Sequence, residues 1–441
     1  MDRRDGARVS RAASVDERYV PHHGDPSYTV TRYDLVVDYV PESNRLTGTA
    51  TLGVRALEPL RKVRLDLNDL RVQKLLVDGA RAKYRQQRAS VSVELGRELA
   101  EGEEAEIMVA YGGRPHPMRG PDGDAGWEEL EEGAIVASQP HGAPSWFPCN
   151  DLPSAKAPFR LELSVPQAFT VVGNGVPGER RRTAGRVVQV FDQPEPMATY
   201  LATVHVGDFV EEQQATSPVP VGFVAPGSLR EQAQDALADQ PAMVAFFDRV
   251  FGPYPFQRYL AVVTPDDLEI PLEAQGLSIF GPNLLHDGWD AQRLIAHELA
   301  HQWFGNSVTL RHWNDIWLHE GFACYAEWLW SEESGRESAD ERARHHHAKL
   351  QAKDQDLLLA DPGPDLMFDD RVYKRGALTL HALRRRVGDD AFFTVLRTWT
   401  DRFRHANADT ADLERVVADV AGEQTDLFDQ WVRATAVPDL P

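Results

Sequence analysis

The residues that could do chemistry in this chain gather between positions 297 and 320. In the run H-E-L-A-H, His297 and His301 are four residues apart, so on a helix both rings lie on one face and can ligate one ion. Glu298 lies about 100° round that helix from His297, where it can reach a water molecule without binding the metal. Glu320, which eighteen residues separate from His301, is the expected third ligand. Two histidines, one glutamate and a fourth position left to water are the donor set of a catalytic zinc site rather than a structural one.

The surroundings of this motif favour a metal site over a chance match. Residues 293–304 are a helix-compatible run without proline that ends at Gly305, and residues 313–331 have apolar side chains at the spacing of a second buried helix. Buried carboxylates need partners, so bringing two histidines and a glutamate together without a cation would be unfavourable. The consecutive histidines 345–347 point three ways on a helix and are expected to form a solvated face instead.

The elements that must position these residues are of two kinds. From residue 28 to about 209, short apolar or alternating runs separated by glycine, proline and aspartate predict an all-β sandwich or saddle-like sheet. Beyond that point the spacing predicts a mainly helical part with a small sheet. Helices are expected at 229–251, 293–304, 313–331, 339–350, 373–387, 391–403, 411–420 and 426–435. The chain is thus divided into a disordered charged tail (1–25), an N-terminal β domain (26–210) and a catalytic domain (211–441).

Length and composition agree with a two-domain α+β protein. At 441 residues the chain is too long for one ordinary core, and its 42% hydrophobic content is that of a globular protein. A net charge of −21 argues against nucleic acid or an anionic membrane surface as a partner. No signal-like segment and no long apolar run is present, which predicts a cytoplasmic protein without a membrane span. Cys149 and Cys324 lack redox or metal spacing and are expected to be buried free thiols.

Five motifs carry a resemblance to a known family. They are H-E-L-A-H at 297–301, W-L-H-E-G-F-A around Glu320, V-Y-K-R-G-A at 372–377, S-W-F-P-C-N-D at 145–151 and P-L-E-A-Q-G-L at 271–277. With them, nearly everything after residue 28 resembles the aminopeptidase N and leukotriene hydrolase family of zinc peptidases, within the gluzincins. The resemblance implies an N-terminal β domain followed by a thermolysin-like catalytic domain that holds one zinc ion. The C-terminal helical domain usual in the family is not expected, because this chain stops at Pro441.

Peptide hydrolysis requires further groups, and the resemblance implies which residues supply them. Glu298 would take a proton from the attacking water and pass it to the leaving amine. The oxyanion of the tetrahedral intermediate needs a donor besides the metal, and by resemblance Tyr373 supplies it. A free α-ammonium calls for a carboxylate, which by resemblance is Glu273, and Gln139 resembles the family's glutamine near the first substrate pocket. The I-P-L-E-A run differs from the family's G-x-M-E-N around the same glutamate, and His141 stands where some members have a second acid.

Two residues just before the third ligand complete the predicted site. His319 replaces the family's usual asparagine and is expected to point away from the zinc, about 100° round the helix from Glu320. Asp315 is a candidate for the carboxylate that orients one of the ligand histidines.

The sequence leaves more than one function open. The leading hypothesis is a zinc-dependent aminopeptidase that hydrolyses the N-terminal bond of peptides. An open-cleft endopeptidase is the alternative, because the cleft of a chain without the C-terminal helical domain could admit longer substrates. An epoxide hydrolase that uses the same zinc, as in one branch of the family, is a further alternative. A non-enzymatic binding protein is disfavoured by the intact set of site residues, and the sequence carries no signal for an oligomeric state or a side-chain preference.

Overall fold

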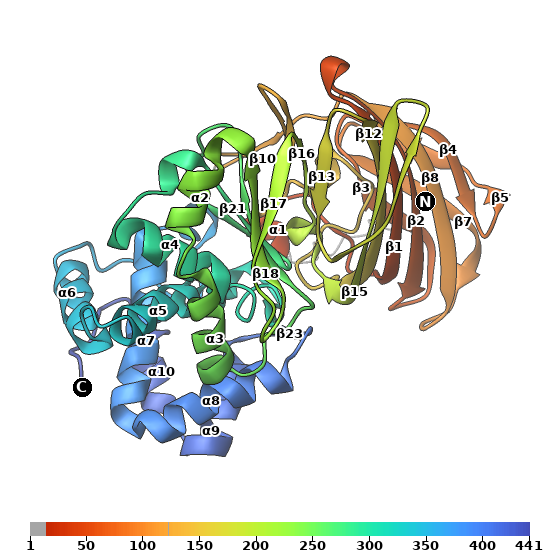
Figure 1. Cartoon of the computed structure of the whole chain (residues 1–441). Helices are drawn as coiled ribbons and strands as arrows, with labels where there is room; N and C mark the ends of the chain where they lie inside the picture. Colours follow the sequence, from red (N-terminus) through yellow and green to blue (C-terminus); the bar gives the residue numbers. More distant parts are fainter. Residues whose placement is uncertain (1–14, 122) are drawn as a thin grey trace, which may run out of the picture.

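The computed structural model describes residues 15–121 and 123–441. A β-rich half is followed along the chain by a mainly helical half, and the two lie side by side (Figure 1). The predicted fold class, an all-β part followed by a helical part, is therefore confirmed. Among the described residues no helix is both long and apolar enough to cross a membrane.

The β-rich half is built around an eight-stranded sheet. Its central strand β1 (Tyr28–Val40) runs antiparallel to β2 (Arg45–Ala56) and parallel to β12 (Ala157–Pro166). Buried positions alternate along β1 and β12, as expected for strands with one face on the core. The sheet is completed by β14 (Val176–Thr183), β15 (Arg186–Met197), β8 (Glu104–Gly113), β4 (Arg71–Val77) and β5 (Ala80–Arg81). A three-stranded sheet contains β3 (Leu60–Asp66), β7 (Ser90–Leu99) and β6 (Tyr84–Gln86).

A third sheet of this half leads the chain toward the helical half. Its β10 (Gly123–Leu130) and β11 (Gly133–Ala137) form a hairpin, and β11 ends two residues before Gln139. Its other strands are β13 (Thr170–Gly173), β16 (Val204–Gly207) and β9 (Met118–Gly120).

The helical half contains one five-stranded sheet, in the order β17-β18-β19-β21-β20. Strands β18 (Val221–Pro226), β19 (Tyr259–Val263) and β21 (Leu277–Phe280) are parallel and correspond to the small predicted sheet. Strand β17 (Phe209–Ala215) and the edge strand β20 (Leu272–Ala274) extend it on either side. The edge position of β20 leaves its side chains, Glu273 among them, at the border of the sheet.

The helices lie in the predicted order, and one of the predicted helices is divided in two. The single helix expected over 229–251 is two helices, α2 (Arg230–Ala236) and α3 (Gln240–Phe251). Pro241 lies in the first turn of α3, where a missing N–H is harmless, whereas inside one long helix it would have removed a hydrogen bond. The other helices are α4 (Trp289–Ala300), α5 (Trp317–Glu333), α6 (Ala339–Gln351), α7 (Asp370–Val387), α8 (Asp389–Arg402), α9 (Thr410–Ala421) and α10 (Thr425–Trp431), and a short bridge joins β22 (Thr309–Leu310) to β23 (Asn407–Ala408).

Two glycines let α5 and α7 approach each other closely. A Cβ atom on Gly321 would lie 2.7 Å from the Cα of Gly376, so neither position has room for a side chain. Gly321 directly follows Glu320, and Gly376 lies one turn after Tyr373. The close contact therefore brings the third predicted ligand and the predicted oxyanion donor together.

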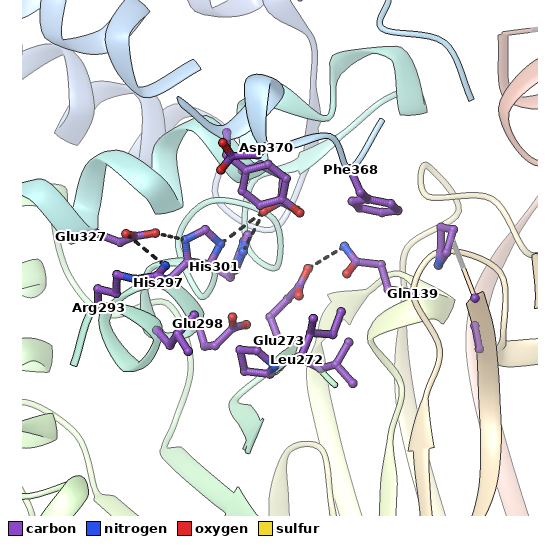
Figure 2. A pocket seen from close by; sticks show the side chains of 18 of the residues that line it. Gln139, Leu272, Glu273, Arg293, His297, Glu298, His301, Glu327, Phe368 and Asp370 are labelled. Carbon is purple, nitrogen blue, oxygen red and sulfur yellow. Dashed lines mark hydrogen bonds and ion pairs between the residues drawn. The ribbon is translucent and has the colours of Figure 1, made fainter. Parts of the chain in front are cut away.

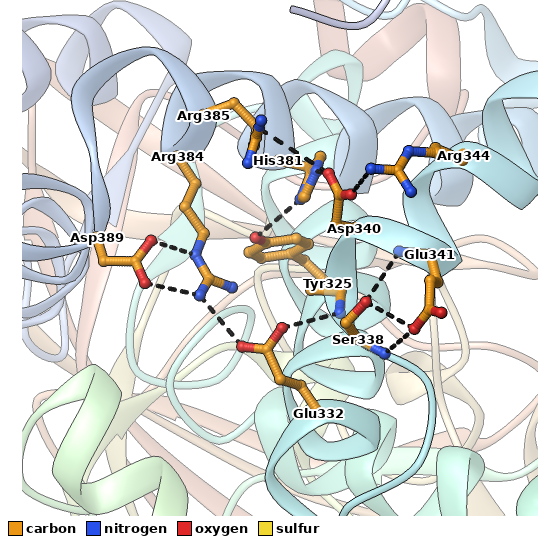
Figure 3. A network of polar contacts seen from close by, with 11 residues as sticks. Tyr325, Glu332, Ser338, Asp340, Glu341, Arg344, His381, Arg384, Arg385 and Asp389 are labelled. Atoms are coloured by element: carbon orange, nitrogen blue, oxygen red, sulfur yellow. Dashed lines mark hydrogen bonds and ion pairs between the residues drawn. The ribbon is translucent and has the colours of Figure 1, made fainter.

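A network of polar side chains ties the same two helices to α6 and α8 (Figure 3). His381 of α7 contacts the hydroxyl of Tyr325 on α5 and the carboxylate of Asp340 on α6, each at 3.3 Å. Arg384, one turn further along α7, pairs with Glu332 of α5 and with Asp389 of α8. Helices α5 and α7 are thus fixed to α6 and α8.

The amino-terminal segment differs from the prediction of a disordered tail. Residues 1–14 lie outside the described residues, but residues 15–25 are ordered and begin with the short helix α1 (Val15–Tyr19). The segment is held by polar contacts, Asp16 with His312 and Tyr19 with Asp361, and by burial of Tyr19 and Val20 in the core. The partners are distant in the chain, so no local pattern in the sequence indicates them. The two cysteines are buried and free, as expected.

Candidate active site

Helices α4 and α5 bring the three predicted metal ligands together. One ligand atom each of His297, His301 and Glu320 lies within 4.8 Å of the others, and all three side chains are buried. The Glu320 Oε2 atom is 3.3 Å from His297 Nε2 and 3.5 Å from His301 Nε2. Both Nε2 atoms therefore face the same carboxylate.

The other ring nitrogens show how the two histidines are oriented. His297 Nδ1 lies 2.8 Å from Glu327 Oε1, and His301 Nδ1 lies 3.0 Å from the carbonyl oxygen of Phe304. Both acceptors place a proton on Nδ1, so in the neutral form of each ring Nε2 carries the lone pair that can ligate a metal ion. Two imidazole Nε2 atoms and one carboxylate at this spacing fit a zinc ion with an open coordination position.

Electrostatics support a cation at this position. Burial alone would lower the pKa of His297, but its hydrogen bonds with Glu320 and Glu327 outweigh burial and raise the pKa to about 9. Burial would raise the pKa of Glu320, yet His301 and His297 hold it well below its ordinary value. The buried carboxylates thus create a strong preference for positive charge, which a divalent ion satisfies.

Glu298 extends from α4, the helix of His297, into the cleft. Burial raises the pKa of its carboxyl group to about 8, and its Oε2 atom has no hydrogen-bond partner among the described residues. A buried carboxyl group with one unpaired oxygen and a pKa near neutrality, beside a predicted metal position, can exchange a proton with a water molecule.

Tyr373 reaches the site from the first turn of α7. Its ring stacks on His297, with the centroids 5.9 Å apart. Burial raises the pKa of its hydroxyl group, so the group keeps its proton and can act as a donor.

Glu273 and Gln139 meet at the other end of the site. Gln139 Nε2 donates a hydrogen bond of 2.7 Å to Glu273 Oε1, which links the β-rich half to the helical half (Figure 2). One carboxylate oxygen of Glu273 also lies within 4.8 Å of ligand atoms of Glu298 and His301. Glu273 is therefore a second acid close to the predicted metal position, and with Glu298 and His301 it forms another group of described residues whose spacing could hold an ion.

All of these side chains line one cleft of about 390 Å³. Its walls come from both halves of the chain, and Figure 2 shows Phe368 and Gln139 close to Glu273, with Glu327 and Arg293 on the other side of His297. Every predicted catalytic, ligand and substrate-binding residue is in this lining.

The sequence also predicted the orientation of His319 and the role of Asp315. The first prediction is confirmed and the second is wrong. His319 Nε2 accepts a 2.7 Å hydrogen bond from the Leu310 amide and is absent from the cleft lining, as expected. Asp315 instead accepts a hydrogen bond of 2.5 Å from the Thr410 hydroxyl, so it orients neither histidine. The carboxylate that does so is Glu327, which sequence reasoning missed. It lies seven residues after Glu320, two turns along the same face of α5, and that spacing was the available signal.

His141 and the three consecutive histidines have other surroundings. His141 is buried, lines the cleft and packs edge-on against His23 with ring centroids 5.7 Å apart. His345–His347 are not among the groups of described residues whose spacing could hold a metal ion. They are not simply solvated, because His346 stacks on Trp328 and His347 contacts the carbonyl oxygen of Pro438.

The class of HExxH metallopeptidases is defined by three features found here: an HExxH helix with two histidine ligands, a glutamate as the third ligand, and a buried glutamate beside them that is not a ligand. Comparison with family models agrees: residues 29–201 match the Peptidase M1 N-terminal domain and residues 235–431 match the Peptidase family M1 domain. The M1 zinc metallopeptidase from Deinococcus radiodurans is 32% identical in sequence, with a TM-score of 0.89 over 97% of this chain and 99% of that one. The chain belongs to peptidase family M1.

The curated relatives are longer proteins, and their sequence identity to this chain is lower. The leucyl aminopeptidase of Saccharolobus solfataricus is 24% identical over 93% of this chain and 54% of its own length. Aminopeptidase M1-A of Oryza sativa subsp. japonica is 30% identical over 70% of this chain and 38% of its own length. This chain therefore spans about half the length, or less, of these relatives.

Proposed function

We propose that this protein is a zinc-dependent aminopeptidase that releases the N-terminal residue of peptides. The observation that carries the proposal is the position of Glu273, a buried carboxylate that is not one of the three ligands but has an oxygen within 4.8 Å of ligand atoms of Glu298 and His301. A carboxylate at that place can pair with the α-ammonium of a peptide whose first carbonyl group lies at the metal. The names of the relatives, a zinc metallopeptidase and several aminopeptidases, support it.

The proposed zinc ion is held by His297, His301 and Glu320. When bound, zinc lowers the pKa of a water molecule toward neutrality and polarises the carbonyl group that the water attacks. Glu327 keeps His297 in the tautomer that presents Nε2, through its 2.8 Å contact with Nδ1.

The remaining residues act on the peptide and on protons. Glu298 takes the proton of the attacking water and delivers it to the leaving amine. Tyr373 donates its hydroxyl proton in a hydrogen bond to the oxyanion that develops on the carbonyl oxygen. Glu273 binds the free α-ammonium, and Gln139 orients Glu273 and contacts the first residue of the peptide. In this assignment Glu273 is the acid that binds the α-ammonium, and His141 occupies the place of the second acid that some family members have.

The domain division is part of the proposal. We place the β domain over residues 26–210 and the catalytic domain over 211–441. The two matched family regions support this division. Strand β17 pairs with β18 of the catalytic domain from Phe209 onward, so the boundary moves by a few residues at most. The substrates are peptides. A cytoplasmic location and the absence of nucleic-acid or membrane partners remain predictions from the sequence.

A paired-substrate assay tests the proposal. An unblocked peptide and its N-acetylated counterpart are each incubated with the protein, with and without a zinc chelator. Chelator-sensitive cleavage of the unblocked peptide alone is the expected result. Equal cleavage of both would favour the open-cleft endopeptidase, and cleavage of neither would turn the search to epoxides, the remaining alternative.

A further inference from the structure

The ordered amino-terminal segment, residues 15–25, contacts both halves of the molecule within a few residues. At its start, Asp16 is buried and its carboxylate contacts His312 Nδ1 at 2.8 Å and the Trp313 amide at 3.3 Å. These contacts join the segment to the turn that precedes α5, the helix of Glu320.

Tyr19 fixes a second part of the helical half. Its buried hydroxyl donates a 2.6 Å hydrogen bond to Asp361 Oδ1 and accepts one of 2.9 Å from the Gly363 amide. From Gly363 the chain continues through consecutive turns to Phe368, which lines the cleft, and to Asp369, which caps α7 through its side chain. Tyr19 thus holds the start of the loop that places one wall of the cleft and leads to Tyr373.

Four residues later the same segment contacts the β-rich half beside another part of the cleft lining. His23 Nδ1 lies 2.8 Å from Asp151 Oδ2, and the Gly24 amide donates a 2.8 Å hydrogen bond to Asp66 Oδ2. The His23 ring packs edge-on against His141, two residues beyond Gln139. Gly24 has φ = +68°, and a Cβ atom there would lie 2.2 Å from the Leu152 side chain, so only glycine fits this turn.

We propose that residues 15–25 form a clasp that positions the two walls at the amine-binding end of the cleft, with Tyr19 and His23 as its positioning residues. One wall is the Phe368 loop and the other is the Gln139–His141 segment, and both line the cleft that contains Glu273. Figure 2 shows Gln139 next to Glu273, and Phe368 next to Gln139. The clasp does not line the cleft itself. It acts by holding the walls at the spacing at which Gln139 and Glu273 meet, and in this respect the inference rests on the proposed aminopeptidase function.

The two contacts of the clasp are joined by a short piece of chain. Only three residues separate Tyr19 from His23, so a fixed Tyr19 and a fixed His23 limit how far the two walls can move apart. Other contacts between the halves, such as Lys156 with the carbonyl oxygens of Asn306 and Ser307, maintain the general packing. Loss of the clasp is therefore expected to loosen the walls without unfolding the protein.

The test compares Tyr19→Phe and His23→Ala with the unchanged full chain. Each variant is expected to raise KM for an unblocked peptide about five- to tenfold, with kcat within about twofold and zinc content unchanged. His23→Asn, whose side-chain amide can replace the Nδ1 donor, is expected to restore KM. Tyr39→Phe is the matched control, since the Tyr39 side chain contacts Asn44 at 3.3 Å and Trp127, both within the β-rich half.

Amide hydrogen exchange provides a readout that does not depend on activity. Tyr19→Phe is expected to speed exchange over 361–369, His23→Ala over 139–142, and the double variant over both. Unchanged KM and unchanged exchange would overturn the clasp, as would a parallel loss of zinc and kcat at constant KM. If the unchanged chain cleaves no peptide, the proposed function fails, whereas exchange still decides whether the clasp exists.

Discussion

Gln139 and Glu273 are 134 residues apart in the chain and come from different halves of the molecule, yet Gln139 Nε2 donates a 2.7 Å hydrogen bond to Glu273 Oε1 inside the cleft. The bond directs one carboxylate oxygen toward the β-rich half and leaves the other for a ligand. The amine-binding end of the proposed site therefore exists only when the two halves are correctly packed.

Replacing Glu273 tests the amine anchor. Glu273→Gln is expected to lower kcat/KM for unblocked peptides about ten- to a hundredfold, because a charge-assisted hydrogen bond to the α-ammonium is lost. Cleavage of an N-acetylated peptide, if measurable, should be unaffected. Glu269→Gln, an exposed acid outside the cleft lining, is the matched control, and equal losses on both substrates would refute the anchor role.

Glu298 and Glu320 are expected to behave differently when replaced. Glu298→Gln should retain zinc while kcat falls about 10²- to 10⁴-fold, because the proton acceptor is removed and the ligands stay. Glu320→Ala should lose zinc, which metal analysis of the purified variants would show. Normal turnover in Glu298→Gln, or full zinc occupancy in Glu320→Ala, would contradict these assignments.

Tyr373 is expected to act mainly in the transition state. Tyr373→Phe should lower kcat about a hundredfold with little change in KM, because the hydroxyl group stabilises an oxyanion that the bound peptide has not yet formed. Steady-state kinetics separate the two constants. Tyr111→Phe is a suitable control, since the buried Tyr111 hydroxyl has no hydrogen-bond partner among the described residues. A change confined to KM would indicate a binding role instead.

Glu327 was found from the structure and not from the sequence. Glu327→Gln should weaken zinc binding about ten- to a hundredfold, because the carboxylate that orients His297 through Nδ1 is lost. A competition titration with a zinc-binding dye measures the change. Glu333→Gln, an exposed acid on the same helix that pairs with Arg249, should leave zinc affinity unaltered. Equal affinities in both variants would show that His297 needs no such partner.

Lys156 is expected to give the stability a measurable pH dependence. Burial lowers the pKa of its ammonium group from 10.5 to about 7. Between those values the unfolded chain binds more protons than the folded one, so the free energy of unfolding contributed by this residue rises with pH from about 7 to 10.5. Urea unfolding of the unchanged protein and of Lys156→Met should therefore diverge in that direction across the window. Lys74→Met, on the exposed face of β4, controls for loss of a positive charge, and a constant difference for Lys156→Met would contradict the prediction.

The predictable parts of this protein depend on local spacing. His297, Glu298 and His301 could be assigned from sequence because helical periodicity alone places them relative to one another, and Glu320 because the motif around it is specific. The alternation of the early strands and the spacing of the later helices likewise identified both halves in the correct order. Apolar periodicity alone did not reveal the break between α2 and α3. The periodic pattern continues across the break, and Pro241 is the residue that marks it.

Tertiary packing decided the rest, because contacts distant in the chain have no local pattern. Asp315 and Glu327 both lie close to Glu320 in sequence. The packing of α5 against α4 directs Glu327 to His297, whereas Asp315 meets Thr410 at the start of α9. The pairing of Gln139 with Glu273 and the attachment of residues 15–25 to both halves arise in the same way. Polar contacts between segments more than a hundred residues apart depend on the complete fold, whereas the ligands of the proposed zinc ion follow from the helices that carry them.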